Sequence, residues 1–258
     1  MIANRFDEYV GQALIRYGEY AELETQLLLQ CANERPGTVV EIGANIGSQT
    51  VPLAKAAKAL GAEVITFEPQ PFLFQNLCAN LALNAVDNVT AWPYACAADP
   101  GTVWFKRPNY KRTGNFGAVS VQTQPLESGI QVPCVRLDDM MRERTVQLLK
   151  VDVEGFELQV LQGARDVLTK HRPLLYVEND RVANSSALIQ YLWEHDYRLL
   201  WHISPLFNPH NFRGNAENCY PQLCSFNMLG VPRESSLTIQ GFEEILDATA
   251  HPLAGRQP

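Results

Sequence analysis

The sequence predicts an α/β fold built on an open, mostly parallel sheet with helices on both faces. Three observations lead to this prediction. At residues 39–47 a β-branched run ends in small residues, and an apolar helical pattern follows. At residues 64–69 a second short apolar run ends in a carboxylate. At residues 148–157 a third apolar run becomes charged only toward its end, as expected where parallel strands meet a ligand.

The segment at residues 39–47 predicts a buried strand, a tight turn and the start of a helix. Gly43 and Gly47 allow a sharp bend and the close approach of a ligand, because neither has a Cβ atom. The first turn of the helix offers free N–H groups to an anionic ligand group. The turn therefore indicates a nucleotide-type cofactor site. Its candidate residues are Glu41, Gly43, Ala44, Asn45 and Gly47.

The second strand ends in Glu68-Pro69, and Glu68 follows Gly47 by 21 residues. A carboxylate at the tip of the neighbouring strand suits hydrogen bonds to ribose hydroxyls. The turn and this acid together favour an adenosine cofactor. A nicotinamide oxidoreductase would share both features, but the dinucleotide fingerprint needs a third glycine that this turn lacks. That enzyme class remains an alternative.

The chain has 258 residues, of which 46% are hydrophobic, so it can bury one sizeable α/β core. We expect an N-terminal helical cap at 1–37, a catalytic domain at 38–231 and a tail at 232–258 with a loose end from 252. A break in the helical pattern at 17–24 either covers the end of the sheet or contacts the ligand.

The formal net charge is −7 and no Lys/Arg cluster exceeds two residues, which argues against nucleic acid as a partner. No apolar run approaches the ~20 residues that a membrane-spanning helix requires. The N-terminus has no apolar signal-peptide region, so we expect a cytoplasmic protein. The oligomeric state is left open.

The remaining pattern continues the alternation, with one irregular stretch at 101–136. Expected helices cover 5–34, 71–84, 156–168 and 187–194, and expected strands cover 89–98, 103–105, 118–121, 132–135, 173–180, 197–203 and 223–231. The small residues Ala95 and Cys96 suit packing against an adenine ring, although an ordinary strand end would look the same. Asn115 lies in a glycine-rich loop that either leans over the site or forms a plain turn.

Charged residues mark the end of the predicted strand at 148–157. A central parallel strand should be almost wholly apolar, yet Lys150 and Asp152 fall on one face of it. Charged side chains are rarely buried unless they are paired or functional. The alternative is an ion pair between Lys150 and Asp152 or Glu154 that only tethers the next helix.

Four motifs resemble the FkbM family of methyltransferases: Glu41-Ile-Gly-Ala-Asn-Ile-Gly47, Phe67-Glu-Pro69, Arg136-Leu-Asp-Asp139 and Leu149-Lys-Val-Asp-Val-Glu-Gly-Phe-Glu157. The resemblance covers roughly residues 17–230. It implies a Rossmann-like class I methyltransferase fold with a seven-stranded sheet whose last strand is antiparallel. It also implies O-methylation with S-adenosyl-L-methionine (SAM). Acceptors in the family are varied, and include hydroxyls of macrolides, sugars and lipids.

Methyl transfer to a hydroxyl needs removal of its proton, and acids at strand tips can serve as the base. The candidate catalytic residues are Asp152, Glu154, Lys150, Glu178 and His202. Asp152 is the first choice for a position beside the methyl group, with Lys150 orienting the carboxylates. A Mg²⁺ site formed by Asp152, Glu154, Glu178 and Asn179 is an alternative. We expect no metal, because catalytic carboxylates often cluster without one.

The insertion at 204–222 falls outside the family core and is rich in asparagine and aromatic residues. Amide and guanidinium groups suit hydroxyls, and aromatic rings can cover the apolar face of a sugar. We therefore expect a saccharide or similar polar acceptor. The substrate-binding candidates are Asn115, Asn179, Asn208, Asn211 and Arg213. A surface loop without ligand contact and an N-methyltransferase remain alternatives.

Overall fold

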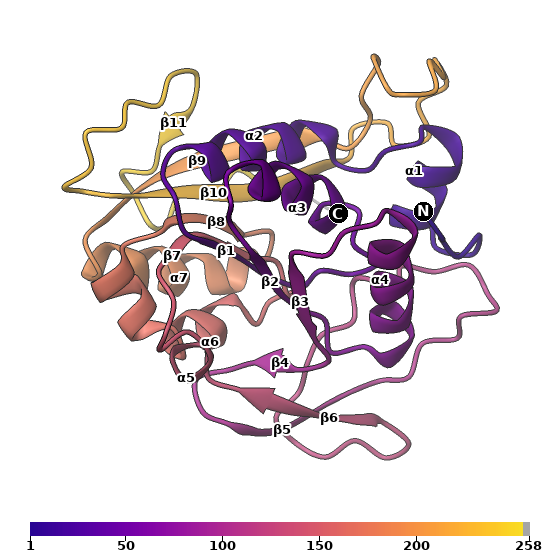
Figure 1. The fold of residues 1–258 in the computed structure, drawn as a ribbon, viewed down its shortest axis with the longest axis horizontal. Coiled ribbons are helices and arrows are strands. Elements are labelled where there is room, and N and C mark those ends of the chain that lie inside the picture. Colours follow the sequence, from indigo (N-terminus) through magenta and orange to yellow (C-terminus); the bar gives the residue numbers. More distant parts are fainter. Residues whose placement is uncertain (255–258) are drawn as a thin grey trace.

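The computed structural model describes residues 1–254, which form one eight-stranded sheet, a separate three-stranded sheet and the helices that cover them (Figure 1). The helices are α1 (Val10–Arg16), α2 (Glu22–Asn33), α3 (Thr50–Ala59), α4 (Pro71–Leu83), α5 (Leu137–Met140), α6 (Glu157–Gln162), the π-helix η1 (Val167–His171) and α7 (Val182–Glu194). The strands are β1 (Thr38–Ile42), β2 (Val64–Phe67), β3 (Val89–Trp92), β4 (Ala95–Cys96), β5 (Gly101–Phe105), β6 (Ile130–Val135), β7 (Val146–Val151), β8 (Leu174–Glu178), β9 (Tyr197–Pro205), β10 (Cys224–Pro232) and β11 (Glu243–Glu244).

The large sheet has the strand order β11-β9-β10-β8-β7-β1-β2-β3. The strands from β8 to β3 pair in parallel, and β1 lies between β2 and β7. β10 is antiparallel to both β8 and β9, which confirms the antiparallel last strand of the predicted seven-stranded sheet. The eighth strand, β11, is added at the edge beside β9 and lies in the expected tail at 232–258.

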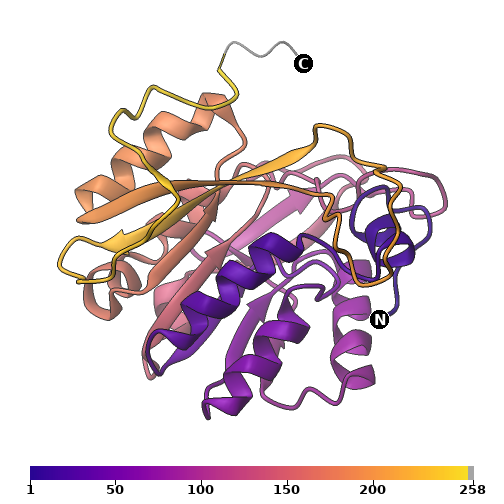
Figure 2. The same cartoon turned by 90° about the horizontal axis from the view of Figure 1, so that it is seen from above.

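Helices cover both faces of the large sheet, as predicted (Figures 1 and 2). α2 and α3 pack on one face through Leu28 and Leu53, which are fully buried there. On the other face, α6 and α7 bury Leu161 and Leu192 in the largest core cluster. α2 therefore belongs to the core of the domain, although its residues fall in the expected N-terminal cap.

The structure departs from the predicted elements in the middle of the chain. The strand expected at 89–98 divides into β3 and β4, which belong to different sheets. The helix expected at 156–168 stops at Gly163, whose Cα packs so closely on Ala97 that a Cβ atom would overlap the Ala97 carbonyl oxygen. Residues 118–121 form no strand, and the described part of the loose end expected at 252–258 is a turn; residues 255–258 lie outside the described residues.

The N-terminal segment and the 204–222 insertion lie side by side at one end of the sheet (Figures 1 and 2). The Tyr17 hydroxyl donates to the Glu217 carbonyl at 2.8 Å and accepts the Cys219 N–H at 2.9 Å. The Glu19 carboxylate accepts from the Asn208 amide at 2.8 Å and the Phe212 N–H at 2.7 Å. These bonds fasten α1 to the insertion. Among the described residues, no helix is long and apolar enough to cross a membrane.

Candidate active site

One face of the large sheet changes from apolar to polar at the carboxyl ends of its strands. Residues paired directly across neighbouring strands project to the same face. Glu41 pairs with Lys150, Lys150 pairs with Tyr176, and Glu178 pairs with Asn227. This row lies on the α2 and α3 side, where β1, β7 and β8 are apolar nearer their amino ends and the antiparallel β10 is apolar nearer its carboxyl end. The polar row is therefore built by the register of four strands.

The polar row opens into a cavity that contains most of the predicted site residues. The predicted residues that line it are Glu41, Gly43, Ala44, Asn45, Glu68, Pro69, Ala95, Cys96, Asn115, Lys150, Asp152, Glu154 and Glu178. Gly43 has a φ of +91°, and a Cβ atom there would overlap the Asp152 carbonyl oxygen. The first glycine of the turn is thus required for the close approach of the β1 and β7 ends.

Lys150 is the charged centre of the site. Its side chain is 2% exposed, and its Nζ lies 3.0 Å from Asp152 Oδ2 and 3.8 Å from Glu41 Oε1. Burial alone would lower the pKa of Lys150, but the carboxylates of Asp152 and Glu41 outweigh burial and raise it. Lys150 is therefore held as a cation. The ion pair considered as an alternative exists, yet Asp152 keeps 35% of its side chain exposed to the cavity.

Glu68 closes the turn after β1 from the end of β2. Its carboxylate accepts the N–H groups of Asn45 and Gln70, each at 2.8 Å. Burial raises the pKa of Glu68 to about 8, against the lowering effect of these two bonds. A carboxylate offers about four lone-pair sites, so the two bonds fix its position and leave capacity for a ligand.

The residues after β7 form a strained turn at the cavity. Glu154 has a φ of +58°, which is uncommon for a residue with a side chain, and Gly155 follows at +94°. Glu157 stabilises the turn because its Oε1 accepts the Gly155 N–H at 2.9 Å and the Val153 N–H at 3.3 Å. Strain of this kind concentrates at functional sites. Here it directs Glu154 into the cavity.

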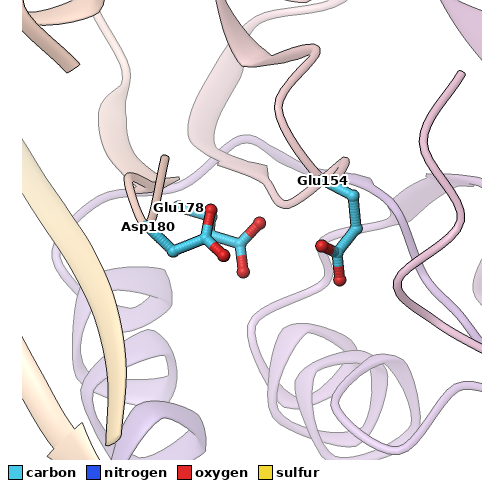
Figure 3. Close-up of side chains that lie close together, drawn as sticks. All are labelled: Glu154, Glu178 and Asp180. Carbon is cyan, nitrogen blue, oxygen red and sulfur yellow. The ribbon is translucent and has the colours of Figure 1, made fainter. Parts of the chain in front are cut away.

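Glu154, Glu178 and Asp180 form an acidic cluster in which one oxygen atom of each lies within 4.8 Å of the others (Figure 3). Arg181 supplies a cation, since its guanidinium lies 2.6 Å from Glu154 Oε2 and 3.4 Å from Asp180 Oδ1. Burial raises the pKa of Glu154 to about 7, helped by the negative charge of Asp152 and opposed by Arg181. Arg181 thus pairs with two of the three acids, and Glu154 and Glu178 present the cluster to the cavity.

The structure contradicts the part of the magnesium alternative that uses Asn179. This side chain is 3% exposed and points away from the cavity: its Nδ2 donates to Ser185 Oγ at 2.9 Å and to Met228 Sδ at 3.2 Å. Asn179 is not in the cavity lining, so the cavity does not support its predicted contact with the substrate, which stays a prediction. Its amide instead fastens β8 to α7 and β10.

Two further candidates lie outside the cavity lining. His202 Nδ1 pairs with the Tyr176 hydroxyl at 2.7 Å, and its ring contacts Phe242 at 5.3 Å between centroids. Burial lowers the pKa of His202 and favours the neutral ring. Gly47 supports the turn: its φ is +84°, and a Cβ atom there would lie 2.8 Å from Leu77. The catalytic role of His202 and the cofactor contact of Gly47 stay predictions that the cavity lining does not support.

The insertion also departs from its predicted role. Asn208, Asn211 and Arg213 do not line the cavity. The Asn211 amide donates to the carbonyls of Asn208 and Asn215, and its Oδ1 accepts the Asn215 N–H at 3.0 Å. The asparagine amides therefore form hydrogen bonds with backbone groups of the loop and with groups of the N-terminal segment. These bonds favour a surface loop, and contact between the insertion and an acceptor stays a prediction.

The cavity also has lining residues that the sequence did not single out. They are contributed mainly by the N-terminal segment, the start of α3 and β10: Tyr9, Val10, Tyr20, Glu24, Ser48, Gln49, Ser225 and Asn227. Two of these residues are polar residues within apolar sequence patterns, which could have identified them. Glu24 precedes Leu28 and Cys31 on the buried stripe of α2, and Asn227 interrupts an apolar strand. The segment at 17–24 thus contacts the cavity through Tyr20 and Glu24.

Replacement of Tyr17 by Phe is expected to destabilise the protein without changing its cavity. Tyr17 is 2% exposed, and the variant leaves the Cys219 N–H and the Glu217 carbonyl without their partner. We expect a loss of about 1–3 kcal/mol in the free energy of unfolding. Thermal unfolding measures it, with Phe212→Ala as a control because Phe212 is 85% exposed. An unchanged melting temperature would show that these bonds do not hold α1.

Comparison with known proteins identifies the family. The model of the methyltransferase FkbM domain matches residues 41–199, which include the turn, Glu68 and the strained segment after β7. The methyltransferase sdnD of Sordaria araneosa is 30% identical over 196 residues, which cover 62% of this chain and 73% of that protein. Methyltransferase 1 of Beauveria bassiana is 29% identical over 148 residues, 50% of this chain and 58% of that protein.

Solved structures share the fold at low sequence identity. An FkbM methyltransferase from Methylobacillus flagellatus superposes with a TM-score of 0.51 and 18% identity, over 75% of this chain and 43% of that one. A precorrin 8w decarboxylase from Methanobacterium thermoautotrophicum gives 0.51 and 14%, over 90% and 99% of the two chains. The chain therefore belongs to the FkbM methyltransferase family and is a SAM-dependent methyltransferase of class I fold.

Proposed function

We propose that the protein transfers the methyl group of SAM to a hydroxyl oxygen of a small polar acceptor, such as a saccharide. One observation carries the proposal. Asp152 presents a partly exposed carboxylate to the cavity at the end of a central strand, and the buried Lys150 cation orients it at 3.0 Å. An oriented carboxylate beside the turn and the ribose acid is the group that deprotonation of a hydroxyl requires.

The cofactor fits the strand tips on the β1 and β2 side of the cavity. Glu68 is positioned for the ribose hydroxyls, and Ala95 and Cys96 offer a flat surface for adenine. Asn45 Oδ1 is buried and has no hydrogen-bond donor among the described residues, which leaves it free to accept one from the ligand. These contacts would hold SAM along the ends of β1, β2 and β4.

The charge of the cavity also favours SAM over a nicotinamide dinucleotide. Among the described residues, six carboxyl side chains line the cavity and Lys150 is its one basic side chain. The six are Glu24, Glu41, Glu68, Asp152, Glu154 and Glu178. SAM carries a sulfonium and an ammonium group, which the ionised fraction of these carboxyl groups attracts, whereas the same groups disfavour a pyrophosphate. This charge distribution argues against the oxidoreductase alternative.

The residues of the chain then have separate tasks in the reaction. SAM supplies an electrophilic methyl group, and the acceptor oxygen must be aligned with it. Asp152 accepts the hydroxyl proton as the new carbon–oxygen bond forms and the carbon–sulfur bond breaks, which leaves S-adenosyl-L-homocysteine. Lys150 holds the Asp152 carboxylate in place through their ion pair. The N-terminal segment excludes water, with Tyr9 and Tyr20 over the cavity.

A direct assay tests this proposal. Titration calorimetry first measures SAM binding to the purified protein. Labelled SAM is then incubated with three acceptor panels, namely p-nitrophenyl glycosides, phenols and primary amines, and mass spectrometry identifies the methylated atom. We expect SAM binding and methylated glycosides. Transfer only to amines would overturn the assignment of a hydroxyl acceptor, and failure to bind SAM would overturn the cofactor site.

Glu68→Gln should weaken SAM binding and remove its pH dependence. The Glu68 carboxyl has a pKa of about 8, so below this pH it must lose its proton to accept ribose hydroxyls in the ionised form. Wild-type affinity should therefore rise with pH between about 6 and 8, by at most about tenfold per unit. At pH 9 the variant should bind at least about tenfold more weakly, because a charge-assisted bond is lost. Calorimetry from pH 6 to 9 measures both effects.

The raised pKa of Glu68 also predicts how the stability of the folded protein depends on pH. Because the pKa of Glu68 is higher in the folded protein than its ordinary value of 4.5, its contribution to stability falls as the pH rises from 4.5 through 8. Glu68→Gln removes this fall but leaves one of the N–H groups of Asn45 and Gln70 without an acceptor. The melting temperature of the ligand-free variant should therefore fall less between pH 5 and pH 9 than that of the wild type. Glu63→Gln serves as a control, since Glu63 pairs with Arg144 outside the cavity.

The binding measurement decides the role of Glu68. Equal SAM affinity in wild type and Glu68→Gln would remove Glu68 from the site.

A further inference from the structure

Asn227 is a buried amide that lines the cavity without a hydrogen-bond partner for its N–H₂ group. The residue is 3% exposed, and its Nδ2 donates to no acceptor among the described residues. The Tyr176 hydroxyl, which pairs with His202 at 2.7 Å, lies close to the Asn227 side chain, but the two do not meet with hydrogen-bond geometry. A buried donor left unpaired costs roughly 1–3 kcal/mol, and native proteins rarely tolerate one without a reason.

Glu178 is the direct cross-strand partner of Asn227, and one of its carboxyl oxygens lacks a hydrogen-bond donor. The two residues are paired in the antiparallel β8–β10 ladder, so their side chains project to the same face. Glu178 Oε2 is buried, lines the cavity and accepts no hydrogen bond among the described residues. An unused donor and an unused acceptor therefore stand next to each other and do not bond to each other.

The chemistry of the two groups selects the ligand. A hydroxyl donates one hydrogen bond and accepts others, so it can satisfy Glu178 and Asn227 at once. An ammonium group only donates, so it would leave Asn227 unpaired. A carboxylate or a phosphate would lie against the carboxyl groups of Asp152 and Glu154, which disfavour an anion there. The site built by this pair therefore fits a hydroxyl.

We propose that Glu178 and Asn227 bind a second hydroxyl of the acceptor, adjacent to the one that is methylated, and so select substrates with neighbouring hydroxyls. This inference rests on the proposed function, which places the reacting oxygen at Asp152. β7 and β8 are adjacent parallel strands, about 4.8 Å apart. A hydroxyl on the neighbouring carbon can thus reach Glu178 while the reacting oxygen faces Asp152.

The position of Asn227 supports a role in specificity. It lies in β10, outside the region at 41–199 that matches the family model, whereas Asp152, Lys150 and Glu178 lie inside it. Ser225 is two residues away on the same face and also lines the cavity, with its hydroxyl bonded to Glu24. The acceptor end of the cavity thus combines residues of the region that matches the family model with residues of β10 and α2.

Asn227→Leu tests the proposal because the two side chains are similar in size. We compare wild type and variant with p-nitrophenyl glycosides that retain all ring hydroxyls and with the corresponding deoxy glycosides that lack the hydroxyl next to the methylated position. In the variant, KM for the full glycoside should rise roughly tenfold or more, because the bond from Nδ2 is lost. KM for the deoxy glycoside should be the same in both proteins.

Two further measurements separate this role from a structural one. The SAM dissociation constant should stay within about twofold of the wild type, and the melting temperature should be equal or higher, because the substitution removes an unpaired buried donor. Glu178→Gln should raise KM for the same full glycoside. Asn76→Leu is the matched control, because Asn76 is half-buried in α4 outside the cavity and its amide bonds only the Phe72 carbonyl of the same helix. It should change neither the SAM dissociation constant nor KM for the glycosides.

The outcomes distinguish this inference from the proposed function. If Asn227→Leu methylates full and deoxy glycosides as the wild type does, the pair does not bind the acceptor, although hydroxyl methylation stands. If the wild type prefers deoxy glycosides or acceptors with a single hydroxyl, the inference is wrong. If SAM binds but no hydroxyl acceptor is methylated, the proposed function fails and this inference fails with it.

Discussion

Asp152→Asn should lower the turnover number for methyl transfer by about 10²–10⁴-fold, the usual contribution of a general base. The substitution keeps the shape of the side chain and removes its ability to accept a proton. SAM affinity should change much less than turnover, because Glu68 and the turn after β1 lie on other strands. Turnover is measured with the best glycoside of the acceptor panel, and SAM affinity by calorimetry.

A matched substitution on the surface controls for general effects. Asp87 pairs with Lys58 outside the cavity, so Asp87→Asn should leave turnover unchanged. If Asp152→Asn retains turnover within about threefold, the loss is too small for a general base. The role would then pass to Glu154, whose pKa of about 7 also suits proton transfer near neutral pH.

Much of the candidate site could be predicted because its charged residues interrupt segments that should be apolar. A central strand should be apolar, and Lys150 and Asp152 violate that expectation within a single short segment. Gly43 and Glu68 likewise stand next to strands whose apolar runs are clear in the sequence. The parallel order of these strands then places all four groups at one edge, so local patterns were enough to identify them.

The rest depends on pairings that no local pattern specifies. Asn227 becomes a neighbour of Glu178 only because β10 inserts between β8 and β9 in the antiparallel direction. Glu24 reaches the cavity only because α2 packs across the sheet, and its carboxylate then accepts from Ser204 and Ser225. In both cases the partners are about fifty or more residues apart in sequence, so the contact follows from topology.

For the insertion at 204–222, the composition predicted contact with an acceptor, whereas the hydrogen bonds lie within the loop and to the N-terminal segment. Its asparagines have the composition of a sugar-binding loop, and composition alone cannot show whether an amide is free. In the structure the Asn208 Oδ1 accepts the His210 N–H at 2.9 Å, and its Nδ2 donates to Glu19. Asx turns of this kind are a common use of asparagine in loops. Hydrogen bonds within the loop and to the N-terminal segment had already satisfied the groups that seemed available for the acceptor.

Lys150→Met should be the most destabilising of the substitutions considered. Lys150 is the only basic side chain among the described residues of the cavity lining, and Glu41 beside it is 1% exposed. Removal of one partner from a buried ion pair costs about 3–5 kcal/mol, because the other charge remains buried without compensation. For a chain of this size we expect the melting temperature to fall by about 10 °C. Lys58→Met, at an exposed ion pair, should melt close to the wild type.

The pH dependence of Lys150→Met identifies the charge that is left uncompensated. Burial already raises the pKa of Glu41, and Lys150 opposes that rise, so removal of Lys150 should raise the pKa further. A carboxyl with a raised pKa in the folded state stabilises the protein as the pH falls and the proton is taken up. The variant should therefore regain stability between pH 8 and about pH 5.5, and adding Glu41→Gln should restore most of the loss at pH 8. If the double variant melts as low as Lys150→Met, the lost stability comes from packing around the lysine stem, and the buried charge of Glu41 is not its cause.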